Sequence, residues 1–455
     1  MTSPDPKGPE PVSLLLLPAL ALGSTTASQI SAYKRTFETL LPRLVPKRDS
    51  QSSQTTTITT AISRLDVAIV LSPTYPISPL IPRAGVFRPY QQLLAETYSL
   101  ICAVAAETEV ELDFPGGLDL RLFQLESRVD QLPQQLRGKQ FLSGPIVDIQ
   151  TFGLAASSRS YMTIYSIEGE VGEGHLRALT TAWQATGNKT APPVQRLPSG
   201  PAMTIPMTNS TTTGQDSRFS SFSAQLLQEG EADGPVSTHK AVAVGGTFDH
   251  LHIGHKLLLT GTLLAAEPPS YSSSLSDDKS EPRTITVGIT GDALLVNKKY
   301  GSVVEPWSLR QQRTSEFVES ILIFHPDVAS IKTTEYIDEP GPNGKVVRVT
   351  YGGEIAINYT QISDPYGPTI TDENISALVI SGETRAGGKA VNDKRKEKGW
   401  KELEIFEVDV LDASLAMDGH EGDGQKQKKE SFESKISSTN IRKRLLEMSA
   451  TGAGQ

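Results

Sequence analysis

The feature that most constrains the fold is a short apolar run that ends in two glycines and leads into a helix. Residues 241–244 read AVAV, and Gly245 and Gly246 follow directly. Glycine lets the backbone turn tightly and lets a ligand approach without obstruction by a Cβ atom. Three leucines at residues 257–259 indicate that a helix has begun by then. A strand, a glycine turn and a helix predict a parallel α/β unit that binds its ligand beyond the strand's carboxyl end.

Apolar runs and helical patterns alternate along much of the remaining chain. Strands are expected at residues 13–22, 64–72, 160–171, 241–244, 283–290, 377–381 and 403–411, and helices at residues 89–108, 308–322 and 437–447. Ser308 and Gln311 are expected to form a capping box at the start of their helix. Such alternation favours parallel sheets.

The composition changes between two such blocks. Residues 191–237 are rich in Pro, Ser, Thr and Gly and cannot bury enough apolar surface to order themselves, which predicts a disordered linker. A smaller N-terminal α/β domain of unknown role then covers residues 1–190, and a second α/β domain covers residues 238–449. Three similar stretches, residues 267–283, 338–345 and 418–430, are expected to be surface insertions.

Charge and cysteine content exclude several classes of protein. The 455 residues carry a formal net charge of -9, so neither nucleic acid nor an anionic membrane is an expected partner. Cys102 is the single cysteine, which excludes an internal disulfide and a cysteine-based metal site. A reducing, cytoplasmic location is expected. The apolar residues 13–22 resemble a signal sequence, but acidic residues precede them, so a buried strand is the preferred interpretation.

Three of the chain's seven histidines lie between residues 250 and 255. His252 and His255 are three residues apart, so they project from one face of the first helical turn. Unpaired N–H groups at a helix start attract anions, and Gly254 leaves room for a flat group against the backbone. The pattern predicts a phosphate site. A zinc pair would need a third ligand that no motif supplies, and two core histidines are the other alternative. His250 is expected to be structural or to lie at the surface.

At this point the residues resemble a known family. GGTFDHLHIGH, residues 245–255, fits the signature of the nucleotidylyltransferase superfamily, and KISSTNIRKRL, residues 435–445, resembles its second, I-S-S-T-x-I-R motif. Residues 287–299, 304–313 and 378–395 resemble the eukaryotic, fungal-type branch of the pantetheine-phosphate adenylyltransferases. The resemblance covers residues 238–449.

This resemblance implies a Rossmann-like fold and a reaction in coenzyme A synthesis. AMP would pass from ATP to 4′-phosphopantetheine, giving dephospho-CoA and pyrophosphate, with Mg²⁺ on the phosphates. The attacking phosphate is ionised near neutral pH, so catalysis is expected to consist of positioning and electrostatic stabilisation. Other enzymes of coenzyme A synthesis are candidate partners.

The family's site residues can be carried over by position. His255 would donate to the α-phosphate, and His252 would hold neighbouring phosphate oxygens. Thr247 would orient the incoming phosphate, and Lys298, rather than the adjacent Lys299, would bridge both phosphates. Asp249 would either ligate Mg²⁺ or cap the histidine helix. The full set expected to bind ATP is Gly245, Gly246, Thr247, His252, Gly254, His255, Arg385, Ser437, Ser438, Thr439 and Arg442.

Two alternatives stay open. One is another nucleotidyltransferase of the superfamily, either a cytidylyltransferase or a nicotinamide-mononucleotide adenylyltransferase. Cytidylyltransferases usually carry R-T-x-G-I-S-T-T, and ESKISSTNIR here lacks its Arg-Thr opening. The other alternative is a catalytically silent nucleotide-binding scaffold.

Overall fold

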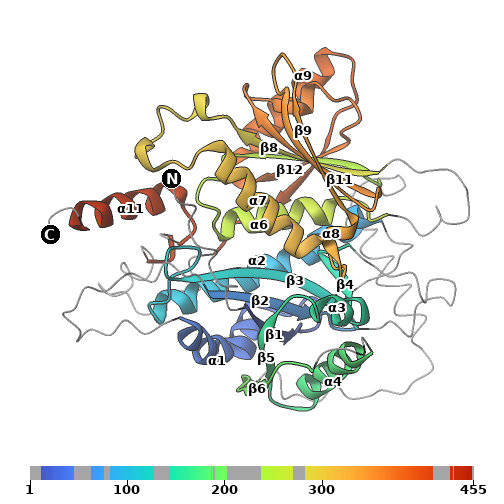
Figure 1. Cartoon of the computed structure of the whole chain (residues 1–455), viewed down its shortest axis with the longest axis vertical. Coiled ribbons are helices and arrows are strands. Elements are labelled where there is room, and N and C mark those ends of the chain that lie inside the picture. Colours follow the sequence, from blue (N-terminus) through green and yellow to red (C-terminus); the bar gives the residue numbers. More distant parts are fainter. Residues whose placement is uncertain are drawn as a thin grey trace, which may run out of the picture.

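The computed structural model describes residues 12–45, 63–75, 82–127, 143–185, 187, 190–201, 237–269, 282–412, 431–433 and 435–452. These residues form two α/β units, each built on its own sheet (Figure 1). The predicted surface insertion at residues 418–430, and most of the one at residues 267–283, lie outside the described residues. None of the helices in the described ranges has the length and apolar character that crossing a bilayer requires.

The first unit is a parallel sheet with the strand order β4-β3-β2-β1-β5-β6. Its strands are β1 (Val12–Pro18), β2 (Ser63–Val70), β3 (Leu118–Glu126), β4 (Ile146–Asp148), β5 (Tyr161–Ile167) and β6 (Val194–Leu197), and its helices are α1 (Thr26–Leu44), α2 (Arg83–Glu107), α3 (Ile149–Ala156) and α4 (Glu170–Gln184). The leucine run of β1 is buried, as expected for a strand covered on both faces.

One boundary needs correction. The linker was expected to begin at residue 191, but β6 pairs with β5 in parallel, so the first sheet extends past residue 190. The sequence VQRL has two exposed polar residues because β6 is an edge strand, and this hid it among the prolines. Residues 202–236 of the predicted linker lie outside the described residues.

The second sheet has the order β13-β12-β7-β8-β11-β10-β9. It contains β7 (Ala241–Gly246), β8 (Arg283–Thr290), β9 (Lys332–Asp338), β10 (Lys345–Tyr351), β11 (Ile355–Ile362), β12 (Ala377–Ser381) and β13 (Glu404–Val408), with the helices α6 (Ile253–Ala265), α7 (Trp307–Leu322), α8 (Val328–Ile331), α9 (Arg385–Glu397) and α11 (Ser438–Gly452). Short 3₁₀ turns occur at η4 (Asp292–Leu294), η5 (Gly301–Val303), η6 (Gly367–Ile370) and η7 (Gly382–Thr384). The five strands from β13 to β11 are parallel, which gives the expected Rossmann-like core.

Two expectations for this unit are wrong. Strands β9 and β10 pair antiparallel at one edge, and residues 338–345 form the turn of that hairpin instead of an insertion. Helix α7 begins at Trp307 with Pro306 as its N-cap and has no side-chain cap, so Ser308 and Gln311 form no capping box. The proline fixes the backbone two residues earlier than the serine would.

The two units share one hydrophobic core. Helix α2 of the first unit packs against α6 of the second, and both lie between the two sheets (Figure 1). Aromatic contacts continue the core, with ring centroids 4.9 Å apart for Phe87 and Phe406 and 5.1 Å apart for Phe123 and Phe324. Buried residues of both units belong to the same cluster. The first unit is therefore a structural layer beneath the glycine turn and its helix.

Candidate functional site

A tight turn joins β7 to α6. Phe248 and His250 both adopt positive φ, at 50° and 46°, and the Phe248 ring is fully buried. A Cβ atom on Gly246 would lie 3.0 Å from that ring, so a larger residue here would press against Phe248. A Cβ on Gly245 would meet nothing within 4 Å, which leaves the end of β7 open on that side.

His252 and His255 lie on one face of the first turn of α6, as their spacing predicts. Their rings stack with centroids 3.9 Å apart and an interplanar angle of 22°. A Cβ on Gly254 would come within 3.2 Å of the His252 ring, so glycine here lets that ring lie close to the backbone. His252 is the N-cap of α6 and makes no side-chain capping bond. The N–H groups of the first turn therefore lack the usual side-chain acceptor.

The second signature reaches this turn from the start of α11. Ser438 Oγ lies 3.2 Å from His252 Nε2 and donates to the backbone carbonyl of Asp249 at 2.9 Å. Because the hydroxyl has one proton and gives it to the carbonyl, His252 Nε2 carries the proton that Ser438 accepts. A Cβ on Gly254 would also lie 3.8 Å from the carbonyl oxygen of Ile436. The segment before α11 therefore lies against the histidine turn.

A buried ion pair joins the same two segments. The Asp249 side chain is fully buried; its Oδ2 accepts from Arg442 Nη1 at 2.5 Å and its Oδ1 accepts from the Glu305 amide at 2.9 Å. Arg442 also donates to the Lys299 carbonyl and to Thr439 Oγ1. Asp249 therefore does not cap α6, and its carboxylate is committed to Arg442. This contact fixes the two segments relative to each other.

Burial keeps both imidazoles neutral. Desolvation lowers the pKa of His255 to about 4, although the nearby Asp249 carboxylate acts in the opposite direction. Desolvation also lowers the pKa of His252 well below its usual value, and His255 adds to that effect. The Nδ1 atoms of both rings are buried and have no hydrogen-bond partner among the described residues. Such atoms are costly unless a ligand or water meets them.

The remaining predicted residues are less closely joined to this turn. Thr247 is partly exposed and its carbonyl accepts from Arg310. Lys298 and Lys299 are exposed in the loop after η4, where the Lys299 ammonium lies 5.2 Å from the Tyr300 ring centroid. Arg385 begins α9, is largely exposed and pairs with Glu407. Ser437 Oγ accepts from the Asn440 amide at 3.5 Å, at the start of α11.

Sequence reasoning missed a buried arginine that supports the turn. Arg310 is fully buried and donates to the carbonyls of Glu305 and Thr247 and to Asp292 Oδ1. Its one sequence signal was its position next to apolar residues on α7. His250 is structural, because its amide donates to Glu305 and its Nε2 donates to the Val303 carbonyl at 2.8 Å.

Within the described ranges, no three His, Cys, Asp or Glu side chains come together as a metal-binding set. The Asp249 carboxylate, just before the histidine turn, is already paired with Arg442.

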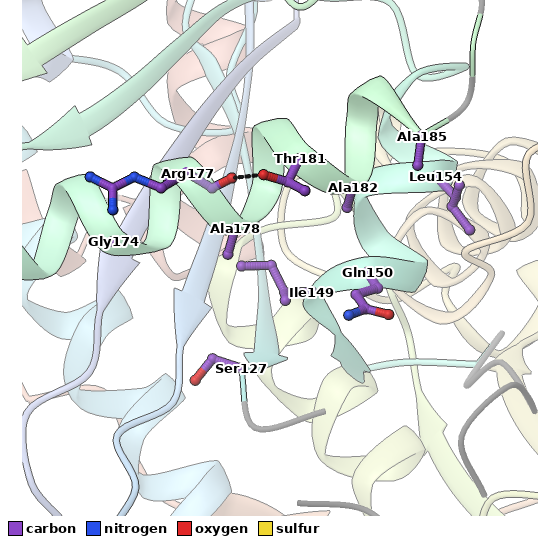
Figure 2. A pocket seen from close by; sticks show the side chains of 10 residues that line it. All are labelled: Ser127, Ile149, Gln150, Leu154, Gly174, Arg177, Ala178, Thr181, Ala182 and Ala185. Atoms are coloured by element: carbon purple, nitrogen blue, oxygen red, sulfur yellow. Dashed lines mark hydrogen bonds between the residues drawn. The ribbon is translucent and has the colours of Figure 1, made fainter. Parts of the chain in front are cut away.

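Two cavities bear on ligand binding. One of about 180 Å³ lies between β7, β12, η6 and α9 and is lined by Gly245, Val379, Tyr366, Thr384 and Gly388 among others. The other, of about 580 Å³, lies between α3 and α4 of the first unit, where Arg177 and Gln150 are among its few polar residues (Figure 2). Only the first adjoins the glycine turn. It lies where the strand order reverses around β7, the usual ligand position in such sheets.

Comparison with known proteins finds one matching family model and several relatives. Residues 1–203 match a family described as a domain of unknown function (DUF8446). An uncharacterized protein of Schizosaccharomyces pombe is 31% identical over 220 residues, which are 48% of this chain and 52% of that protein. A phosphopantetheine adenylyltransferase of Saccharomyces cerevisiae is 33% identical over 223 residues, which are 49% of this chain and 54% of the yeast protein.

An archaeal relative is shorter. The phosphopantetheine adenylyltransferase of Methanothermobacter thermautotrophicus is 27% identical over 175 residues, which are 38% of this chain and 76% of the archaeal protein. The chain spans about half the length of the two fungal proteins that it matches. About half of this chain is therefore related to proteins that carry the name phosphopantetheine adenylyltransferase.

Proposed function

We propose that this chain transfers AMP from ATP to 4′-phosphopantetheine, forming dephospho-CoA and pyrophosphate. The observation that carries the proposal is the contact between His252 Nε2 and Ser438 Oγ, which joins two signature segments 186 residues apart. The relatives in a yeast and an archaeon support the choice of acceptor.

In the proposed reaction, an oxygen of the acceptor's phosphate attacks the α-phosphorus of ATP. A new P–O bond forms, the bond to the bridging oxygen of the β-phosphate breaks, and pyrophosphate leaves with that electron pair. The attacking phosphate is ionised near neutral pH, so no base is needed. The barrier arises from bringing two anions together, and positioned hydrogen-bond donors lower it.

The histidine turn is suited to that task. Because its pKa is low, His255 is a neutral imidazole with one N–H to donate to the α-phosphate. A neutral ring carries no positive charge that a neighbouring carboxylate must first balance. His252 donates its Nε2 proton to Ser438, so it orients residues 437–442, which we call the serine turn, while its buried Nδ1 stays an acceptor. A bound anion would raise the pKa of both rings.

Other groups would hold the rest of the substrates. The amides at the start of α6 and the hydroxyls of Ser437 and Thr439 are suited to phosphate oxygens, with Lys298 next to the acceptor phosphate. The 180 Å³ cavity beside Gly245 is mainly apolar and suits an uncharged part of a substrate. Mg²⁺ would arrive with ATP and neutralise part of the triphosphate charge.

The test is pyrophosphate release by the full chain. We expect release from ATP that depends on 4′-phosphopantetheine, with dephospho-CoA formed in equal amount. Parallel reactions with CTP, and with nicotinamide mononucleotide as acceptor, separate the other nucleotidyltransferases. ATP binding without turnover on any of these acceptors would favour the silent scaffold and contradict the proposal.

A further inference from the structure

The first unit contacts both signature segments through acidic side chains near one loop. The loop lies between α2 and β3 and contains Glu111 and Asp113; Asp119 follows at the start of β3. We call Glu111, Asp113 and Asp119 the acidic clamp. Each of them meets a cation of the second unit.

Lys256 is the first of these cations and directly follows His255 on α6. Its ammonium is buried, with 2% of the side chain exposed, and lies 2.5 Å from Asp113 Oδ1, 2.5 Å from Asp119 Oδ1 and 2.8 Å from the Leu120 carbonyl. An ammonium has three N–H donors, so all three are satisfied by the first unit. A lysine of α6 that points to the first unit thus holds the histidine helix in place.

Lys435 and Arg444 are the other two cations, and they flank the serine turn of the second signature. Glu111 forms an ion pair with each of them: its Oε1 lies 2.8 Å from Arg444 Nη2, and its Oε2 lies 3.8 Å from Lys435 Nζ. The Arg444 guanidinium also lies 4.2 Å from the Phe114 ring centroid. Both ends of the turn are therefore tied to the loop that also binds Lys256.

We infer that the acidic clamp is a positioning device: the first unit sets the distance between the histidine turn and the serine turn. One short loop binds a cation next to His255 and two cations around Ser437–Arg442, so the loop acts as a common base for both. Hydrogen-bond donors hold a ligand much less well when the segments that carry them are loosely held. This gives the domain of unknown function a role in the site of the second unit. The part of the inference that concerns ATP rests on the proposed function.

The test uses the full chain with Glu111→Gln, which keeps the shape of the side chain and removes its charge. Glu173→Gln is the matched control, because Glu173 pairs with Arg196 in the same unit and far from the signatures. Three quantities are measured: the ¹⁵N shift of His252 Nε2 without nucleotide, the Kd for ATP and the Tm.

Glu111→Gln is expected to change the His252 shift, because Ser438 moves when its segment loses an anchor. It should raise the Kd for ATP about fivefold, a typical effect of a mutation in a coupled network. The pair is partly exposed, so the Tm should fall by less than about 4 °C. Glu173→Gln should change neither the shift nor the Kd. An unchanged His252 shift in Glu111→Gln would overturn the inference whether or not the chain turns out to be an adenylyltransferase.

Asp113 tests the contact with α6 separately. Asp113→Ala leaves one N–H of Lys256 without an acceptor, whereas Asp113→Asn keeps an acceptor oxygen at the same place. We expect the alanine variant to raise the Kd for ATP about fivefold and the asparagine variant to restore it to within twofold. Equal losses in the two variants would contradict a positioning role for this contact. Lys256 itself is a poor choice, because its removal leaves the buried Asp113 carboxylate without its cation and leaves Asp119 with Arg121 alone.

Discussion

The helices that follow β1 and β7 begin in opposite ways, although both strands lie where the order of a parallel sheet reverses. After β1, Thr25 caps α1 by accepting from the Ser28 amide, and Tyr33 Oη bonds to both the Leu20 amide and the Pro18 carbonyl. After β7, His252 begins α6 without a capping bond, and two buried imidazole nitrogens have no partner among the described residues. One fold thus provides a closed helix start and an open one, and polar groups left open at a helix start indicate where a ligand is expected.

The largest expected effect concerns the ion pair that keeps the open end assembled. Arg442→Met removes the cation from the fully buried Asp249 carboxylate, and breaking a buried pair in this way costs about 3–5 kcal/mol. Urea titration of the full chain measures this loss. Arg64→Met, which removes a partner of the buried Asp66 in the first unit, is the control for a buried pair outside both signature segments. If Arg442→Met weakens ATP binding no more than Arg64→Met does, the open end does not depend on this pair.

The second prediction separates two histidines of similar character. His255→Ala is expected to lower kcat about 10²–10³-fold, because one donor to the charge that develops in the transition state is lost. His175 on α4 also has a pKa lowered to about 4 by burial, and its Nδ1 likewise lacks a partner among the described residues. His175→Ala is expected to leave kcat within about twofold, since the residue lies outside both signature segments. Steady-state kinetics of both variants measure this, and equal losses would show that burial of an imidazole, and not its place beside the serine turn, controls activity.

The same contrast shows what the sequence could predict. The buried strands β1, β2, β5, β7, β8 and β12 were predicted because each is rich in apolar residues. Strand β9 was missed because it is an edge strand with mostly exposed residues, so its sequence KTTEYID has no apolar pattern. A hairpin turn rich in glycine and proline between β9 and β10 then resembled an insertion.

The site was predictable where neighbours in sequence are neighbours in space. The shared face of His252 and His255 follows from their spacing, whereas the second signature was identified only by its resemblance to a family motif. Arg310 and Lys256 were not found, because a cation on a helix normally faces solvent and their acceptors come from distant segments. The shared core between the units could not be predicted either. Helix α6 is buried on both faces, so its apolar sequence does not show that one face packs against another unit.

The smallest expected effect tests the closed end of the comparison. Thr25→Ala removes the acceptor for the Ser28 amide, and losing such a cap costs about 1 kcal/mol of stability. Thr25→Ser, which keeps the hydroxyl, should restore most of that stability. Activity should not change in either variant, because this helix start is satisfied from within the chain and has no open donors to offer a ligand. Urea titration gives the first quantity and pyrophosphate release the second. If Thr25→Ala lowers the affinity for ATP and Thr25→Ser restores it, the capped start of α1 takes part in binding. Capping alone would then not distinguish a helix start that binds a ligand from one that does not.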